Sequence, residues 1–308
     1  YEMTRVMMGI NPQGFSWELS KDEEFQTPEV VMVYSDKGLN GMSQAYHRLY
    51  RDRLMRGKWR NHARPILLNN WEATYFDFDE EKILNIAKKA KEVGVELFVL
   101  DDGWFGTRND DYQGLGDWFV NKNKLPNGIS GLSRKIEEMG LKFGLWVEPE
   151  MISEDSDLYR AHPDWAFAIP GRVPNHSRNQ LVLDMTREDV REYLLERLTT
   201  IVHDAKIDYV KWDMNRSLAD IYAPNVTYDY VLGVYDFLEK LTNRYPDILI
   251  EGCSGGGGRF DAGMLYYTPQ IWCSDNTDAI NRTRIQYGTS FFLSGSSNGF
   301  TCVSSAKP

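Results

Sequence analysis

The sequence has no run of lysine or arginine, no long apolar stretch, and only three cysteines among its 308 residues. Acidic residues outnumber basic ones by 45 to 35, which gives a formal net charge of −10. This balance argues against binding to the phosphate backbone of a nucleic acid. No segment approaches the roughly 20 apolar residues of a membrane-spanning helix, so no membrane partner is expected.

The cysteines, Cys253, Cys273 and Cys302, have neither the spacing of metal ligands nor that of a disulfide framework. This usage is typical of a reducing compartment, and the first residues do not read as a signal peptide, so a cytoplasmic location is expected. No spaced acidic loop of the calcium-binding kind is present. We therefore expect neither a metal nor a cofactor.

From residue 64 onward, short apolar runs alternate with amphipathic segments. Helices are predicted over 41–56, 79–93, 130–139 and from a cap at Thr186 to 204. No glycine-rich dinucleotide fingerprint follows the first strand, so the alternation favours a (β/α)8 TIM-type barrel over an open doubly wound sheet. The predicted strands are 65–71, 96–102, 141–148, 180–184, 207–213, 248–253 and 270–275, with 287–293 as a possible eighth.

The first 34 residues contain β-prone stretches over 1–10, 14–19 and 30–34, interrupted by prolines. We interpret them as strands left from an N-terminal β-sandwich. The predicted division is residues 1–40 for this remnant and linker, and 41–308 for the catalytic barrel. The eighth strand and the structure of the tail over 293–308 stay open in this division.

Nearly every predicted strand ends on polar or charged side chains. In a barrel these strand ends converge on one rim, where active sites lie. Carboxylates accept hydrogen bonds from hydroxyl groups and tryptophan faces cover the C–H surfaces of sugars, so this rim indicates a site for a polyhydroxylated ligand. The strand-end residues are Trp71, Glu72, Asp101, Asp102, Trp104, Glu148, Glu150, Asp184, Lys211, Asp213, Glu251, Cys253, Asp275 and Asn276.

Cleavage of a glycosidic bond requires two carboxyl groups, and Asp213 and Asp275 are the pair that we select. Lys211, two residues before Asp213, favours an ionised nucleophile, whereas Asp275 lies in a less basic stretch that suits an acid. Each also has a plainer interpretation. Asp213 could cap a helix or pair with an arginine, and Asp275 could be an N-cap or an Asx turn.

A set of motifs along the chain resembles glycoside hydrolase family 36, the family of bacterial α-galactosidases, and specifically its catalytic barrel. Each motif is weak alone, but their order is specific, and the resemblance extends from about residue 1 to about residue 293. The motifs are Asn-Trp-Glu-Ala (70–73), Leu-Asp-Asp-Gly-Trp-Phe-Gly (100–106), Gly-Asp-Trp (116–118), Gly-Leu-Trp-Val-Glu-Pro-Glu-Met (144–151), Ser-Arg-Asn-Gln-Leu-Val-Leu-Asp (177–184), Lys-Trp-Asp-Met-Asn-Arg (211–216), Glu-Gly-Cys-Ser-Gly-Gly-Gly-Gly-Arg (251–259) and Ser-Asp-Asn-Thr-Asp-Ala (274–279).

This resemblance implies retaining hydrolysis of terminal α-galactosides such as melibiose and raffinose through a covalent galactosyl-enzyme intermediate. It implies that Asp213 is the nucleophile and Asp275 the acid/base. Family members need no metal and commonly form homo-oligomers, and their C-terminal β domain is absent here. The implied substrate-binding residues are Trp71, Asp101, Asp102, Trp104, Trp146, Arg178, Lys211, Asn215, Cys253 and Gly256.

Two other functions remain open at this point: galactosyl transfer to a sugar acceptor, and galactoside binding without turnover in a chain that lacks flanking domains. Several residues also have alternatives. The glycines at 255–258 lack the lysine and hydroxyl of a phosphate loop and indicate close backbone approach to a sugar. Glu148 and Glu150 could be catalytic by their chemistry, but Pro149 and the family pattern favour a structural or rim role. His176 could touch substrate or be a solvated loop residue.

Overall fold

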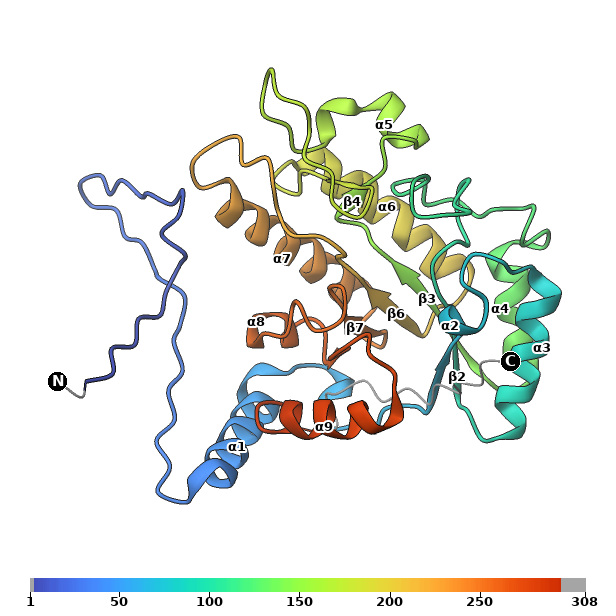
Figure 1. Cartoon of the computed structure of the whole chain (residues 1–308), viewed down its shortest axis with the longest axis horizontal. Coiled ribbons are helices and arrows are strands. Elements are labelled where there is room, and N and C mark those ends of the chain that lie inside the picture. Colours follow the sequence, from blue (N-terminus) through green and yellow to red (C-terminus); the bar gives the residue numbers. More distant parts are fainter. Residues whose placement is uncertain (1–2, 295–308) are drawn as a thin grey trace.

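The computed structural model describes residues 3–294, and a parallel sheet of six strands lies at its centre (Figure 1). The strand order is β1-β2-β3-β6-β7-β8, and each neighbouring pair is parallel. The α/β class and the parallel sheet are thus confirmed. The strands are β1 (Leu67–Asn69), β2 (Leu97–Leu100), β3 (Lys142–Val147), β6 (Tyr209–Trp212), β7 (Leu249–Gly252) and β8 (Gln270–Ile271).

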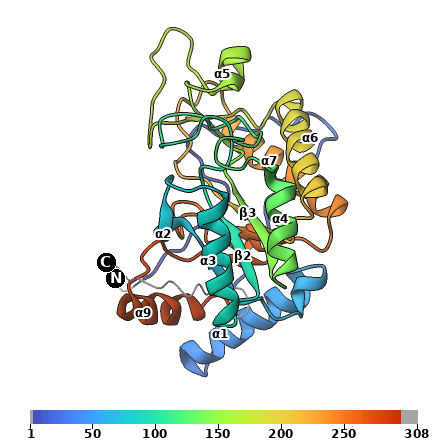
Figure 2. The ribbon, with the colours of Figure 1, turned by 90° about the vertical axis from the view of Figure 1, so that its right-hand side faces the viewer.

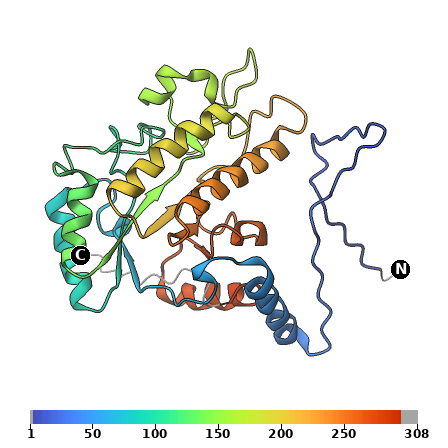
Figure 3. The same ribbon diagram turned by 180° about the vertical axis from the view of Figure 1, so that it is seen from behind.

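Helices follow the strands and cover the sheet, and their buried faces carry the predicted helical spacing. Figure 2 shows α3 and α4 beside β2 and β3, and Figure 3 shows α6 and α7 side by side. The helices are α1 (Gly38–Leu49), η1 (Tyr50–Leu54), η2 (Lys58–Arg60), α2 (Trp71–Thr74), α3 (Glu80–Glu92), α4 (Gly128–Glu138), α5 (Asp157–Ala161), η3 (Pro163–Trp165), α6 (Glu188–Asp204), α7 (Val226–Arg244), α8 (Ala262–Leu265) and α9 (Ala279–Ser290).

The four predicted helices are present at close to the expected bounds. Helix α3 begins where the carboxylate of Asp79 accepts the backbone N–H of Lys82 at 2.8 Å, and it buries Ile83, Ala87 and Ala90. The cap predicted at Thr186 is wrong. The hydroxyl and amide of Thr186 both donate to the Asp184 carboxylate, at 2.6 and 3.0 Å, and α6 begins two residues later.

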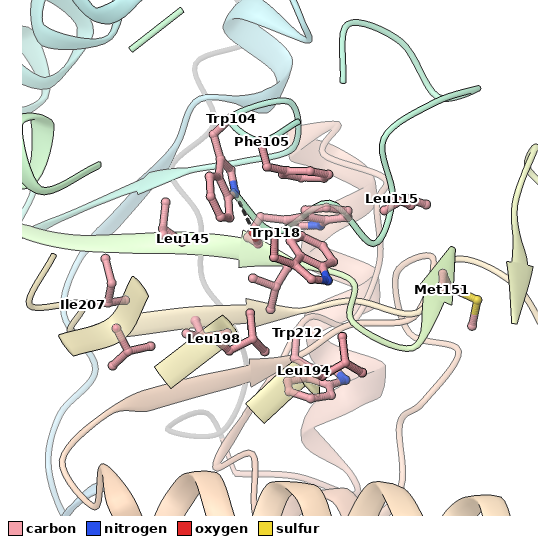
Figure 4. Packing of buried hydrophobic residues seen from close by; sticks show 14 of the residues in the cluster. Trp104, Phe105, Leu115, Trp118, Leu145, Met151, Leu194, Leu198, Ile207 and Trp212 are labelled. Carbon is pink, nitrogen blue, oxygen red and sulfur yellow. Dashed lines mark hydrogen bonds between the residues drawn. The ribbon is translucent and has the colours of Figure 1, made fainter. Parts of the chain in front are cut away.

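An aromatic cluster fills the core beneath the loops that follow β2 and β3 (Figure 4). Trp104, Phe105, Trp118 and Trp146 are all buried, and their ring centroids lie 4.5–6.5 Å apart. The Trp104 indole N–H donates to the backbone oxygen of Trp146 at 2.9 Å. These contacts fix the loops relative to the strands, because tilted and edge-on aromatic pairs have preferred geometries.

Two predicted strands do not join the central sheet. Within 180–184, only β5 (Leu181–Val182) is a strand, and it pairs antiparallel with β4 (Met151–Ile152) in a separate two-stranded sheet. An isolated apolar run cannot reveal its partner, so periodicity does not distinguish a strand of this separate sheet from a strand of the central one. The segment 287–293 lies in α9 and the turn after it, where the backbone N–H groups are bonded helically to carbonyls three or four residues back.

Residues 3–34 form no strand, contrary to the prediction, and they extend away from the body of the molecule (Figure 1). A strand requires a partner for its backbone groups, and no neighbouring backbone in residues 3–294 supplies one. The segment touches the body near the start of α7. Asn225 bonds to the backbone of Gly14 and Ser16, and Phe15, Trp17 and Phe25 pack around Tyr228.

Within residues 3–294, no helix combines the length and the apolar character required to cross a membrane. The tail that was singled out over 293–308 falls outside the described residues, apart from its first two positions.

Candidate active site

A cavity of about 300 Å³ lies at the C-terminal ends of the sheet strands, as the strand-end pattern predicted. Side chains that lie in or directly after each of the six strands of the parallel sheet contribute to its wall. The lining residues are Leu67, Asn69, Trp71, Glu72, Tyr75, Phe76, Asp101, Asp102, Arg108, Asp111, Trp146, Glu148, Arg178, Gln180, Tyr209, Lys211, Asp213, Asn215, Glu251, Trp272, Asp275 and Thr277.

Nine of the twelve predicted site residues line this cavity, and three do not. Trp104 is fully buried in the aromatic cluster. Cys253 is buried behind the wall, where burial and the nearby Asp213 raise the pKa of its thiol well above the ordinary value. A Cβ added to Gly256 would lie 2.9 Å from the Asp275 amide, so this glycine allows close approach of two loops.

Asp213 follows β6 and is buried, with its carboxylate held by three N–H groups. The Trp146 indole donates to Oδ2 at 3.0 Å, and the amides of Met214 and Gly255 donate to Oδ1 at 2.9 and 3.3 Å. Its own amide donates to Val147, which extends the pairing of β6 with β3. The carboxylate is therefore fixed in orientation before any ligand arrives. Neither a helix cap nor an arginine partner accounts for it.

Lys211 lies on the same face of β6 as Asp213, because side chains two positions apart on a strand point the same way. Its ammonium pairs with Asp101 Oδ2 at 3.1 Å, a partner that the sequence did not indicate. Burial acts to lower the pKa of Lys211, but the charges of Asp101, Asp213 and Glu251 together raise it well above its usual range. Lys211 thus supplies a permanent positive charge to the floor of the site.

Asp101 and Asp102 follow β2 and are both buried, but they have different partners. Asp101 accepts hydrogen bonds from Lys211 and from the side-chain amide of Asn69. Asp102 is held by Arg108, whose Nε and Nη2 donate at 2.9 and 2.8 Å to its two oxygens. A bidentate pair of this kind fixes the plane of the carboxylate. The adjacent carboxylates therefore present defined acceptor directions to the cavity.

Asp275 lies on the loop after β8 and is exposed, in contrast to Asp213. The Trp272 indole N–H donates to its Oδ1 at 2.8 Å. The cap of α9 is Asp278, whose Oδ1 accepts the amides of Ile280 and Asn281. Asp275 lines the cavity and is therefore not the helix cap that was one alternative for it.

Gly256 packs its backbone against this loop, so the loops after β7 and β8 support each other.

Glu148 follows β3 and connects several lining residues. Its carboxylate accepts the side-chain amide of Gln180 at 2.7 Å, the side-chain amide of Asn215 at 3.1 Å, and also the Asn215 backbone N–H. Burial raises the pKa of Glu148, and the negative charge of Asp213 raises it further. The oxygen of Asn215 then accepts Arg178 Nη1 at 3.1 Å, so a single chain of hydrogen bonds runs along this wall.

Arg178 reaches the cavity from a tight hairpin. Ser177 and Gln180 exchange backbone hydrogen bonds, and the two residues between them, Arg178 and Asn179, have positive φ values of 52° and 59°. Two left-handed residues in succession define a type I′ turn, which is unusual for arginine. His176, on the same hairpin, is paired at 2.9 Å with Glu154 and is not among the residues that line the cavity.

Glu150 does not line the cavity. It is fully buried and accepts two hydrogen bonds from Arg259, at 2.6 and 2.9 Å, with further bonds from Trp212 and Tyr230 at 2.8 Å each. Burial acts to raise the pKa of Glu150, but Arg259 outweighs it and the pKa is lowered. The structural role expected for Glu150 is confirmed.

Arg108, Gln180 and Tyr209 line the cavity but were not selected from the sequence. Arg108 lies on a long connection, where periodicity gives no direction for a side chain, and Gln180 begins the predicted strand 180–184, which does not join the central sheet. Tyr209 could have been found, because it is two positions before Lys211 and four before Asp213 on the same strand face.

The arrangement combines two carboxyl groups, one buried and held by N–H donors and one exposed, with hydroxyl-binding side chains around them. Such a pair suits displacement at a sugar carbon with protonation of the leaving oxygen. No nucleotide-binding loop borders the cavity among residues 3–294. The glycines at 256–258 instead pack against residues 254 and 273–275, and Gly255 lies beside the side chains of Arg178 and Asn215.

Comparison with known proteins places this site in a family. The Melibiase family model matches residues 24–307. Alpha-galactosidase AgaA of Geobacillus stearothermophilus is 60% identical over 294 residues, which cover 93% of this chain and 40% of that protein. The bifunctional alpha-galactosidase/sucrose kinase AgaSK of Mediterraneibacter gnavus is 58% identical over 299 residues, which cover 97% of this chain and 32% of that protein.

A crystal structure of an AgaA variant of glycoside hydrolase family 36 in complex with raffinose has a TM-score of 0.92 and 58% identity, and the match covers 94% of this chain and 42% of that one. This chain thus spans about two fifths or less of the length of the curated relatives. The model match and the identities agree over nearly the whole chain. The chain belongs to the melibiase family, glycoside hydrolase family 36.

Proposed function

We propose that the protein of which this chain is a part hydrolyses terminal α-galactosides, such as raffinose-type oligosaccharides, with retention at the anomeric carbon. The observation that carries the proposal is the convergence of Asp213 and Asp275 on one cavity that also contains Asp101, Asp102 and Lys211. Family membership and a relative crystallised with raffinose support the choice of substrate.

In the first step, a carboxylate oxygen of Asp213 attacks C1 of the galactose ring, and the bond from C1 to the leaving oxygen breaks. Asp275 donates its proton to that oxygen. The exposure of Asp275 suits this task, because a departing sugar must leave past it and water must enter. In the second step, Asp275 takes a proton from water, the water oxygen bonds to C1, and the bond between C1 and Asp213 breaks.

The neighbouring groups have separate tasks in this scheme. Trp146 and the amides of Met214 and Gly255 orient Asp213, so little reorganisation is needed at the moment of attack. Asp101 and Asp102 accept hydroxyl hydrogen bonds from one side of the galactose ring, and Arg178 and Asn215 bind hydroxyl groups on another. A sugar with the opposite configuration at one hydroxyl would leave one of these buried acceptors without a donor.

We also propose that the six strands are part of a (β/α)8 barrel and that the whole protein forms homo-oligomers. The strand order and the parallel pairing support the barrel, because consecutive strands of the open sheet lie side by side as barrel strands do.

Replacement of the proposed nucleophile tests the function. We expect Asp213→Ala to lower kcat for an aryl α-galactoside by at least about 10⁴-fold, as loss of a nucleophile does in other hydrolases. Added azide should restore turnover and yield β-galactosyl azide, because azide attacks from the face that Asp213 occupied. Asp110→Ala, at a half-buried position of the loop after β2 that does not line the cavity, serves as the control. Unchanged galactose release by Asp213→Ala would contradict the proposal.

A further inference from the structure

Lys124 lies behind the cavity wall, and its ammonium group contacts three backbone carbonyls. The distances from Nζ are 3.0 Å to Phe76 O, 2.9 Å to Gly103 O and 3.0 Å to Arg108 O. An ammonium group has three donors and no acceptor, so three carbonyl oxygens match its full capacity. This coordination by backbone oxygens is the kind that a free cation would otherwise need.

The backbone of Lys124 is held as firmly as its side chain. Its carbonyl accepts the amide of Glu80 at 3.0 Å, at the start of α3, and its amide donates to Asn121 at 3.2 Å. Nζ also lies 4.7 Å from the centre of the Phe78 ring. A Cβ on Gly103 would come within 3.3 Å of Nζ, and the φ of 100° at that position already favours glycine.

The three carbonyls belong to the two loops that build one side of the cavity. Phe76 lines the cavity and lies on the connection after β1. Gly103 directly follows Asp102, and Arg108 holds the Asp102 carboxylate in its bidentate pair. A single ammonium group therefore connects the aromatic wall after β1 with the carboxylate wall after β2.

The charge of Lys124 is subject to opposing influences. Burial lowers the pKa of Lys124 below its ordinary value, although the nearby negative charge of Asp102 acts to raise it. A neutral amine has one donor fewer and would direct a lone pair at one of the three carbonyls. The geometry of the contacts is thus satisfied fully only by the charged form.

We propose that Lys124 is a positioning residue for the sugar-binding wall: its tethered ammonium occupies a cation site formed by the carbonyls of Phe76, Gly103 and Arg108, and so aligns Asp102. This inference rests on the proposed function for its activity readout. Lys124 does not line the cavity, so it acts through these loops and not by contact with the sugar.

Two variants separate the charge from the packing. Lys124→Ala removes three methylene groups and the ammonium, which together correspond to n-propylammonium, whereas Lys124→Met retains an unbranched apolar chain without charge. Lys91→Ala is the matched control, because the Lys91 ammonium also donates to a backbone carbonyl, Gly140 O at 2.9 Å, but is exposed and remote from the cavity lining.

We expect both Lys124 variants to lower kcat/KM for an aryl α-galactoside by about 10- to 100-fold, as loss of outer-shell partners does elsewhere. Most of the loss should appear in KM, because Asp102 and Phe76 belong to the binding wall. Added n-propylammonium should restore at least part of the activity of Lys124→Ala, while propan-1-ol should not. Lys124→Met should not respond, and Lys91→Ala should match the unchanged chain.

The experiment distinguishes failure of this inference from failure of the proposed function. If the whole protein with the unsubstituted sequence releases no galactose, the proposed activity fails, and galactose affinity by calorimetry then replaces KM as the readout for the same variants. If the unchanged chain is active or binds galactose, equal behaviour of Lys124→Ala, or rescue by propan-1-ol as well as by n-propylammonium, overturns the inference. Loss of the folded state in both Lys124 variants also overturns it, because the role would then concern the whole fold.

Discussion

Glu148 and Glu150 stand on either side of Pro149 after β3, and the protein places them in opposite surroundings. Glu148 receives only N–H groups from Gln180 and Asn215, lies near the negative charge of Asp213, and has a raised pKa. Glu150 receives the guanidinium of Arg259, and its pKa is lowered.

The difference shows that burial alone does not decide the charge of a carboxyl group. Both glutamates are buried, and burial acts in the same direction on each. The cation that lowers the pKa of Glu150 is Arg259, which lies on the loop after β7, 109 positions further along the chain. Glu148 has no such partner within residues 3–294, so its charge stays linked to that of Asp213. One glutamate stabilises the fold, and the other belongs to the site.

The largest effect is expected from breaking the clamp on Glu150. Glu150→Ala leaves the Arg259 charge buried without its partner, which destabilises a protein by about 3–5 kcal/mol. Denaturant-induced unfolding measures the change. Lys240→Ala, which removes an exposed ion pair with Asp236, is the control and should change stability by no more than about 0.5 kcal/mol. An equal loss of unfolding free energy in the two variants would mean that the buried pair stabilises the fold no more than an exposed pair does.

A second prediction concerns the pH dependence of stability. Glu148 has its pKa raised to about 8 from an ordinary value of 4.5. Between these values the unfolded chain has released this proton and the folded chain has not, so the contribution of Glu148 to stability falls as pH rises through this range and is constant above it. Glu148→Gln removes that titration, so its stability relative to the unchanged chain should rise across the range.

Each pKa unit of such a shift corresponds to about 1.4 kcal/mol, so the difference between pH 5 and pH 8 should be on the order of a few kcal/mol. Unfolding free energies at pH 5 and pH 8 measure it. The same comparison on Glu150→Gln provides the contrast, because a group with a lowered pKa loses its contribution as pH falls. Parallel curves for Glu148→Gln and the unchanged chain would show that Glu148 does not hold a proton in this range.

The smallest effect is expected for Tyr230→Phe, which removes one of the four hydrogen bonds to Glu150. Arg259 still satisfies the same carboxylate oxygen, so the loss should be about 1 kcal/mol. Thermal and denaturant unfolding measure it. Tyr222→Phe, which removes a hydrogen bond to Asp184 at a more exposed position, should lose less. If Tyr230→Phe lost as much unfolding free energy as Glu150→Ala, the Tyr230 hydroxyl and not Arg259 would be the main stabilising partner of Glu150.

The sequence was most informative at the C-terminal ends of the strands, where the direction of a side chain is set by the strand that precedes it. The C-terminal ends of two buried apolar strands carry Asp101, Lys211 and Asp213. A parallel sheet brings such ends together independently of the conformation of the connecting loops. The same logic identified Asp275 after β8. Motif resemblance added Arg178 and Asn215, which no periodicity would have selected.

The sequence was least informative about partners that come from distant segments. Nothing in the sequence around Asp102 shows that Arg108, and not a ligand, fixes the orientation of the Asp102 carboxylate. The pairing of Lys211 with Asp101 instead of Asp213 depends on the register of β2, β3 and β6, which is a property of the folded sheet. The strand predictions for 180–184 and for residues 3–34 were wrong for a related reason. Whether a segment joins a sheet depends on the strand beside it and not only on its own composition.

The position of a strand in the sheet also determines how often its backbone hydrogen bonds open, and the two proposed catalytic carboxylates differ in this respect. Asp213 follows β6, which is paired on both sides, with β3 and β7, whereas Asp275 follows the two-residue strand β8 at the edge of the described sheet. Amide hydrogens in the middle of a sheet exchange with solvent far more slowly than those at a short edge strand. The carboxylate proposed to hold the sugar covalently thus belongs to the slow-exchanging part of the molecule, and the one proposed to exchange protons with water belongs to the fast-exchanging part.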